Sequence, residues 1–147
     1  MILTETVDLD YPPDAVIAFL EDMDRHYLAW HPDHIAFRWI ATGDGPKARL
    51  FFDERIGRIR LRSVMDVRRS ADGRFAALTP TSALLRLFFP AMTFAVEDRG
   101  PGRSRFVHRI RLRLGPLRGI AEPILLGPLR RHMAEEAGNL HRLIAGR

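Results

Sequence analysis

The sequence contains no cysteine among its 147 residues. Disulfide bonds and thiolate metal sites are therefore excluded, and a metal ion would have to be held by histidine, carboxylate or water. Long apolar runs are also absent, because no stretch reaches the roughly 18 residues that suggest a membrane span. The opening residues 1–14 are acidic and alternate in polarity, unlike a signal peptide. These absences predict a cytoplasmic protein without a membrane span.

Lysine is scarce, because 22 of the 23 basic residues are arginine, and the net charge is +5. The arginines alternate with apolar residues in stretches 58–62 and 105–113, which is typical of the solvated face of a sheet. No exposed aromatic residues are interleaved to stack on bases, so we predict no nucleic-acid partner. The length and the 46% hydrophobic content fit a single globular domain over residues 1–147.

Polarity patterns predict an α+β domain. Alternation indicates a first strand over residues 2–10, and the run Tyr11-Pro12-Pro13-Asp14 indicates a helix start, since proline in the first turn loses no helical hydrogen bond. A short helix and a second short helix or turn follow, as far as Trp30. Glycine-rich turns then separate six further strands, predicted over 34–41, 48–57, 58–68, 73–79, 87–98 and 103–114. Residues 82–89 fit either helix or strand.

The pattern becomes helical over residues 117–144. Pro116, Pro123 and Pro128 each remove a backbone donor, which predicts a bend or a broken first segment and a continuous helix from near Pro128. A curved antiparallel sheet of about seven strands, covered by this helix, encloses a space for a ligand. We expect the cavity to be lined by Phe52, Phe94, Phe106, Leu125, Leu129 and Leu140.

One side of the C-terminal helix carries two polar residues within an apolar stripe. His132 and Glu136 are spaced i, i+4 and share that side with Leu125, Leu129, Leu140 and Leu143. A buried carboxylate is costly unless something pairs with it. A metal ion is one such partner, and His with Glu suits Zn²⁺ as well as Mn²⁺ or Fe²⁺. The alternative is a satisfied pair of core polar groups at the edge of the stripe.

A third polar residue is predicted on an inward face upstream. On the two-residue period of a strand, Glu54 shares its face with Leu50, Phe52 and Ile56. Asp53 and Arg55 then form an outward pair. Glu54 therefore meets a partner inside the fold, unless the strand has the opposite register.

Histidines supply the remaining candidates. We favour His34 as a metal ligand because it opens a strand. We expect His31 to support it through a hydrogen bond that fixes the orientation of the ring. The alternative is that the segment His31-Pro32-Asp33-His34 is a solvated turn without a metal. His108 lies on the apolar face of the last strand, where it orients a substrate, moves a proton or only bonds to a neighbour. His26 and His141 lie in polar stretches and are expected at the surface.

The order of predicted elements resembles the helix-grip fold of the START domains, birch-pollen-allergen proteins and polyketide cyclases, the SRPBCC superfamily. The segment YPPDAVIAF at residues 11–19 looks like that superfamily's first helix, and Trp30-His31-Pro32 looks like its W-x-P turn into the second strand. The resemblance covers the whole chain. It implies a cavity for a small hydrophobic or aromatic molecule, and the residue two after the proline, His34, pointing into it.

The polar residues also resemble the metal site of the diacetylphloroglucinol and phloretin hydrolase family. That family holds zinc through a His before the second strand, a Glu in the next strand, and an i, i+4 His and Glu on the C-terminal helix. His34 or His31, Glu54, His132 and Glu136 match these places. The resemblance implies a hydrolase that uses metal-activated water to cleave a carbon–carbon bond beside a phenolic ring, with His108 as an acid–base partner.

Two other functions fit the same residues. The first is non-enzymatic binding or transport of an apolar small molecule or lipid, with the polar residues binding its hydroxyl or carboxylate. The second is a metal-independent polyketide cyclase or dehydratase that uses His108 and Glu54 as acid and base.

Overall fold

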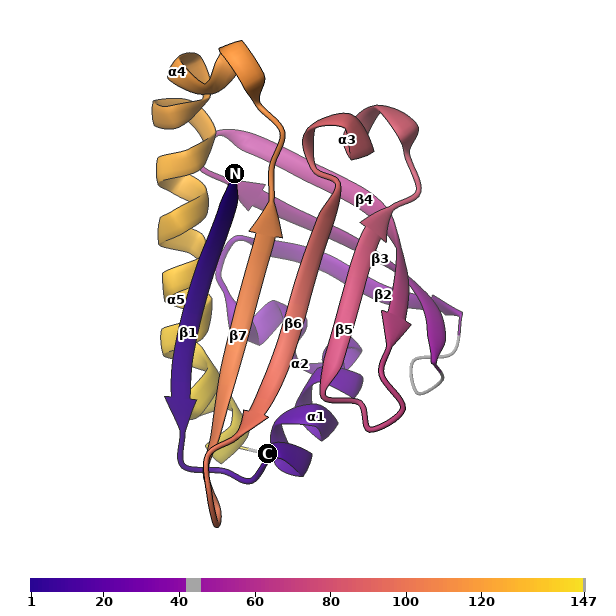
Figure 1. The fold of residues 1–147 in the computed structure, drawn as a ribbon, viewed down its shortest axis with the longest axis vertical. Coiled ribbons are helices and arrows are strands. Elements are labelled where there is room, and N and C mark those ends of the chain that lie inside the picture. The colour runs from indigo at the N-terminus through magenta and orange to yellow at the C-terminus, as the bar shows by residue number, and fades with distance from the viewer. Residues whose placement is uncertain (42–45, 147) are drawn as a thin grey trace.

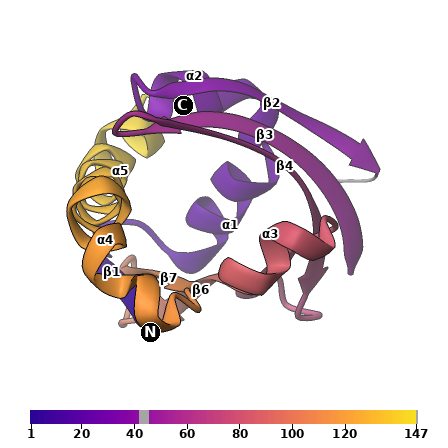
Figure 2. The ribbon, with the colours of Figure 1, turned by 90° about the horizontal axis from the view of Figure 1, so that it is seen from above.

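Seven strands form one antiparallel sheet in the order β1-β7-β6-β5-β4-β3-β2 in the computed structural model, which describes residues 1–41 and 46–146. The strands are β1 (Ile2–Leu9), β2 (His34–Ala41), β3 (Lys47–Ile56), β4 (Ile59–Arg69), β5 (Phe75–Pro80), β6 (Ala91–Asp98) and β7 (Ser104–Arg111). The sheet curves into an open ring that the C-terminal helix closes (Figures 1 and 2). This is the predicted helix-grip fold, and each predicted strand is present.

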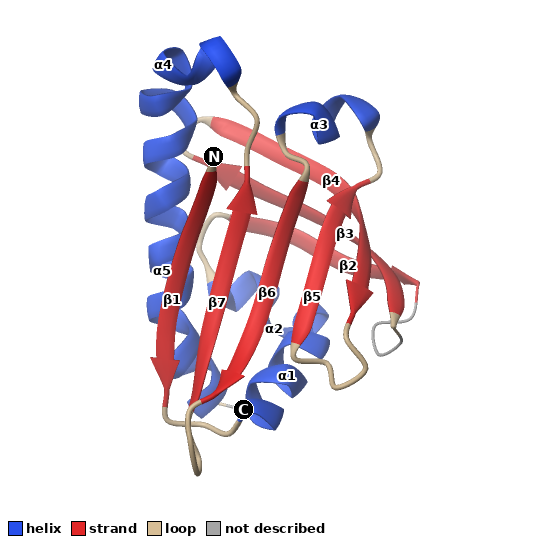
Figure 3. Ribbon diagram, in the orientation of Figure 1, coloured by secondary structure: helices blue, strands red, loops and turns tan. Residues whose placement is uncertain are grey.

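Helices occupy the concave side and one flank of the sheet (Figure 3). Two short helices follow β1 as predicted, α1 (Pro13–Glu21) and α2 (Met23–Trp30). The stretch that fitted either helix or strand contains α3 (Ala83–Phe88), whose first turn is capped by the Ser82 hydroxyl accepting from the backbone N–H of Leu85. None of the helices in the described ranges has the length and apolar character needed to cross a membrane.

The C-terminal helical region is broken in its first half. A 3₁₀ turn, η1 (Gly115–Leu117), leads into α4 (Arg118–Ala121), a π-helical turn, η2 (Glu122–Leu126), and the continuous helix α5 (Gly127–Ala145). The prolines therefore act as predicted, because regular α-helix continues only from the residue before Pro128.

The inward face of β3 follows the predicted alternation, with Leu50, Phe52 and Ile56 buried. The expected outward pair of Asp53 with Arg55 is wrong. Asp53 has little exposed surface and bonds instead to the neighbouring strand β4, where its two carboxylate oxygens accept hydrogen bonds from Arg60 at 3.0 and 2.7 Å. Long side chains on a neighbouring antiparallel strand reach a diagonal partner readily, and this cross-strand contact replaces the pair along β3.

The core lies between the concave face of the sheet, α1 and α5. Its fully buried side chains include Phe19 from α1, Phe106 from β7, Leu126 from η2 and Leu140 from α5. Burying four large side chains from four elements holds α5 against the sheet, and this fixes where the polar residues of α5 lie.

Candidate metal centre and cavity

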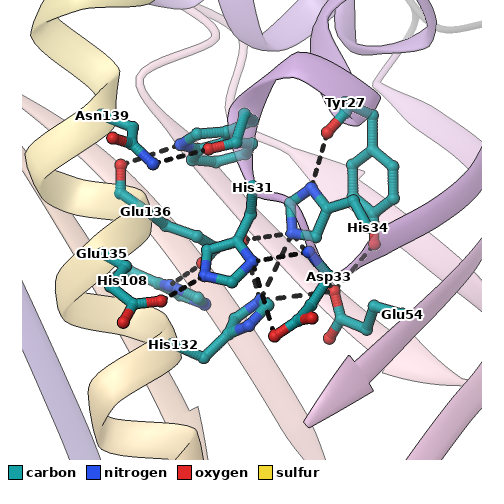
Figure 4. A network of polar contacts seen from close by, with 11 residues as sticks. Tyr27, His31, Asp33, His34, Glu54, His108, His132, Glu135, Glu136 and Asn139 are labelled. Carbon is teal, nitrogen blue, oxygen red and sulfur yellow. Dashed lines mark hydrogen bonds and ion pairs between the residues drawn. The ribbon is translucent and has the colours of Figure 1, made fainter.

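The four favoured metal ligands meet inside the fold although they come from three elements (Figure 4). His34 opens β2, Glu54 lies on β3, and His132 and Glu136 lie one turn apart on α5. One ligand atom from each lies within 4.8 Å of the others. The side chains of His34, His132 and Glu136 are nearly inaccessible, and that of Glu54 is 13% exposed.

The spacing of these atoms suits a tetrahedral ion. His34 Nε2 lies 2.8 Å from Glu136 Oε1, 3.3 Å from His132 Nε2 and 3.5 Å from Glu54 Oε2. His132 Nε2 lies 3.5 Å from Glu136 Oε1 and 3.8 Å from Glu54 Oε2. Tetrahedral zinc bonds of about 2.0–2.1 Å separate their ligand atoms by about 3.4 Å, within this range. Small displacements suffice for the four atoms to surround one ion.

The backbone of α2 sets the protonation of His34. Its Nδ1 lies 2.6 Å from the carbonyl oxygen of Tyr27, which only accepts, so Nδ1 carries the hydrogen. With Nδ1 held in this way, Nε2 points into the cluster, which is the orientation that a metal-ligating histidine has. His34 Nε2 lies 2.8 Å from Glu136 Oε1, and two lone pairs at this distance would repel each other. A second ring proton on Nε2, or a metal ion between the two atoms, removes this repulsion.

The electrostatics of the cluster also favour a cation. Burial, together with the charge of Glu136, raises the pKa of Glu54. Burial alone would raise the pKa of Glu136 too, but hydrogen bonds with His132 and His34 outweigh it and hold that pKa well below its usual range. Burial lowers the pKa of His132, yet the hydrogen bond and charge of Glu136 raise it overall. The buried carboxylates thus draw positive charge toward the histidines.

Tyr27 belongs to the site although the sequence analysis did not select it. Its hydroxyl donates to Glu54 Oε2 at 2.7 Å, and its ring stacks on His34 with centroids 3.8 Å apart. Burial, and next the charge of Glu54, raises the pKa of Tyr27, so the phenol remains a donor. The available signal was its i, i+3 spacing from Trp30, which places both rings on the inner side of α2.

Trp30 and Asn139 fix α2 against α5. The indole Nε1 of Trp30 donates to the backbone carbonyl of Glu136 at 2.9 Å, and Asn139 Nδ2 donates to the carbonyl of Trp30 at 3.0 Å. This reciprocal contact holds the α5 backbone at the candidate ligand Glu136, which is the kind of support that keeps metal ligands oriented.

His31 is buried beside the cluster but is not one of the four. Its Nδ1 accepts from the backbone N–H of Asp33 at 3.0 Å, so Nε2 carries the hydrogen and donates to Glu135 at 2.6 Å. Its ring lies 4.0 Å from that of His132, so it packs against His132 rather than bonding to His34. His31, Asp33 and His132 also group within 4.8 Å, but both nitrogens of His31 are engaged, so the first group is the better candidate for holding an ion.

A cavity of about 290 Å³ adjoins the cluster, and Glu54, His132 and Glu136 form part of its wall. Most of the remaining wall is apolar and includes the predicted residues Phe52, Phe94, Leu125 and Leu129. Phe106 and Leu140 are not among the described residues that line it, contrary to expectation. Phe106 lies behind Phe94, with ring centroids 5.6 Å apart, and Leu140 is fully buried. Alternation predicts the side on which a residue lies but not its depth.

The other histidines occupy three different surroundings. His108 lines the cavity, with Nδ1 3.7 Å from Glu136 Oε2 and Nε2 buried without a hydrogen-bond partner among residues 1–41 and 46–146. Burial lowers the pKa of His108 to about 4, so the ring is neutral at pH 7. His26 is half-buried and stacks on Phe19 at 4.8 Å, not at the surface as expected. His141 is exposed, as expected.

Residues 2–145 match the sequence profile of the family described as polyketide cyclase / dehydrase and lipid transport. The chain belongs to this family. The predicted superfamily is thereby confirmed. Neither the family description nor the solved structures described below name the hydrolase branch. A search of the curated proteins found no match.

Solved structures share the fold of this polyketide cyclase/dehydrase family member across nearly its whole length. A protein of Thermus thermophilus superposes with a TM-score of 0.80 at 11% identity, covering 99% of this chain and 98% of its own. A START superfamily protein from Mycobacterium smegmatis gives 0.72 at 17% identity, covering 97% and 98%. The Zhui aromatase/cyclase from Streptomyces sp. R1128 gives 0.68 at 14% identity, covering 97% and 94%. At these identities the likeness establishes the fold alone.

Proposed function

We propose that this member of the polyketide cyclase/dehydrase family binds one divalent transition-metal ion, zinc in the first instance, through His34, Glu54, His132 and Glu136. We further propose that it hydrolyses a small aromatic or polyketide-like acyl compound held in the adjoining cavity. The observation that carries the proposal is the convergence of four ligand atoms, with His34 Nδ1 held by a backbone carbonyl and its Nε2 directed among them, on the wall of an apolar cavity.

The donor set is suited to such an ion. Two neutral imidazoles and two carboxylates balance the charge of a divalent cation, which removes the cost of burying Glu54 and Glu136 together. Tyr27 orients Glu54 by donating to the same oxygen that faces the histidines. Water or a substrate carbonyl would take a fifth coordination position, where a bound divalent ion would supply Lewis-acid polarisation of the carbonyl and a lowered pKa for water.

The cavity supplies the remaining requirements. Its apolar wall, which includes Phe52 and Phe94, excludes water and suits an aromatic ring. His108 has a buried Nε2 without a partner among the described residues, so this atom is available to hydrogen-bond with a hydroxyl or water bound beside it. The family description and the aromatase/cyclase neighbour are consistent with a ligand of this class.

The test is turnover of acylated phenols, followed by chromatography of the products, with protein stripped by a chelator and refilled with zinc. We expect turnover only in the refilled protein. His108→Gln should keep the metal and lose about 100-fold or more in kcat, the usual contribution of a general acid or base. Undiminished turnover in metal-free protein would refute the proposal, and chelator-insensitive ring closure would indicate a metal-independent cyclase or dehydratase.

A second candidate function is non-enzymatic carriage of an apolar molecule. The observation that favours it is the composition of the wall, which is apolar apart from a few residues, together with the family's description as including lipid transport. Mass spectrometry of organic extracts of the purified protein tests it. A co-purified lipid without metal would support the carrier, whereas metal without lipid would support the hydrolase.

A further inference from the structure

Exposed apolar side chains collect at one end of the molecule. Helix α3 and the segment formed by η1, α4 and η2 both lie at the upper end in Figure 1, and the view from above places them along one rim (Figure 2). Leu84 and Leu87 are 70% and 61% exposed, and Ile120 and Ile124 are 66% and 52% exposed. We call the following residues the apolar rim: Leu84, Leu87, Phe88, Leu117, Ile120 and Ile124. Single exposed apolar side chains are ordinary, but a cluster marks an interaction site.

The apolar rim borders the cavity. The rim has two halves, α3 on one side and the segment formed by η1, α4 and η2 on the other. A hydrogen bond of 2.8 Å from the backbone N–H of Arg113, just before η1, to the carbonyl of Phe88, at the end of α3, joins the two halves. Phe88 lines the cavity and is also 43% exposed, so only this side chain separates the cavity from the surface at this point. Leu85 and Leu125, from the two halves, also line the cavity. An apolar ligand that enters here passes along apolar side chains throughout.

Positive charge accompanies the apolar rim. Arg86 lies on α3, while Arg113 and Arg118 lie just before and within the opposite half. No Asp or Glu occurs within residues 82–90 or 112–121. The first acidic residue beyond them, Glu122, pairs with Arg130 on α5. The apolar rim therefore combines exposed apolar side chains with arginines on segments that carry no acidic residue. This combination is complementary to a lipid bilayer, in which negatively charged headgroups lie above an apolar acyl layer.

We propose that the apolar rim docks the protein on the surface of an anionic lipid bilayer. Its apolar side chains enter the boundary between headgroups and acyl chains, its arginines contact lipid phosphates, and the cavity mouth faces the membrane interior. A second copy of the chain is a poorer occupant, because apposing two rims would bring arginines against arginines. The proposal is independent of the metal site.

Co-sedimentation with vesicles tests this surface. The wild-type protein should bind vesicles of phosphatidylcholine with phosphatidylglycerol and bind phosphatidylcholine alone far more weakly, with binding reduced by salt. The double variant Leu84→Ser/Ile120→Ser should lose at least about tenfold in partitioning, since each substitution removes an inserted apolar side chain. Arg86→Gln/Arg118→Gln should lose about tenfold on anionic vesicles only.

Matched controls separate insertion from general surface change. Leu28→Ser replaces a leucine that is 61% exposed on α2, away from the rim, and should leave vesicle binding unchanged. His132→Ala should also bind as the wild type does, so loss of the metal site and loss of docking are distinguishable. The inference is overturned if the wild-type protein does not bind anionic vesicles, or if the rim variants bind them as well as the wild-type protein does. Rim-dependent self-association without vesicle binding, seen by sedimentation velocity, would assign the surface to a second copy instead.

Discussion

Glu136→Gln tests the metal centre with the least disturbance of the fold. Glutamine keeps the size and shape of the side chain but removes the negative charge and the carboxylate oxygen 2.8 Å from His34 Nε2. The adjacent Glu135 offers a matched control. It is about half exposed and contacts His31 rather than the four ligands, so Glu135→Gln changes the same charge on the same turn of α5 outside the cluster.

The expected effect is a change in the stabilisation that zinc provides. Because the four ligand atoms already lie within 4.8 Å of one another, binding requires little rearrangement. Free zinc at 1,000 times its dissociation constant adds about 4 kcal/mol to the free energy of unfolding. For a domain of this size, 1 kcal/mol raises the Tm by about 3–4 °C, so zinc should raise it by about 12–16 °C.

Thermal unfolding followed by circular dichroism measures this difference in zinc-loaded and chelator-treated protein. The wild type and Glu135→Gln should show the full rise, and Glu136→Gln should show less than about a quarter of it. Comparing the two forms of each variant cancels any effect of the substitution on the metal-free protein. An equal zinc-induced rise in Glu136→Gln and the wild type would refute the assignment of Glu136 as a ligand.

Other predictions address the support of the site and the fold. Tyr27→Phe should weaken zinc binding about tenfold or more, because Glu54 loses the hydrogen bond that orients it. The stoichiometry should stay the same, because Glu54 itself remains. Competition with a chelating dye measures the affinity, and an unchanged affinity would contradict the prediction. Leu140→Ala should cost about 2–5 kcal/mol in urea unfolding because the side chain is fully buried, and a cost below about 1 kcal/mol would refute its core position. Gly57→Ala should lower the free energy of unfolding by at least about 1 kcal/mol, because φ is +60° and an added Cβ would lie 3.0 Å from Pro128. Gly138→Ala, in open space on α5, should raise the free energy of unfolding by about 0.5–1 kcal/mol.

Local patterns predicted the elements and the inward direction of the site residues. The two-residue period placed Glu54 on the inner face of β3, and the i, i+4 spacing placed His132 and Glu136 together on α5, where the structure brings all three to His34. These relations depend only on the geometry of a single strand or helix.

Relations between elements were not predictable in this way. The choice between His31 and His34 depends on which backbone groups meet each ring, and the carbonyl of Tyr27 that faces His34 is seven residues away. The misassigned partner of Asp53 follows from the register of β3 with β4, and the misassigned position of Phe106 follows from its depth behind the cavity wall. Register and depth are tertiary properties that the period of one element does not specify.

The most direct test of the metal centre is the metal content of untagged protein purified without chelator, measured by elemental mass spectrometry before and after zinc addition and dialysis. We predict about one equivalent of divalent transition metal per chain, lost in His132→Ala and retained in His31→Ala, because His132 contributes a ring nitrogen to the cluster whereas both ring nitrogens of His31 bond elsewhere. A folded wild-type protein that carries no metal and takes up none from added zinc would contradict the account.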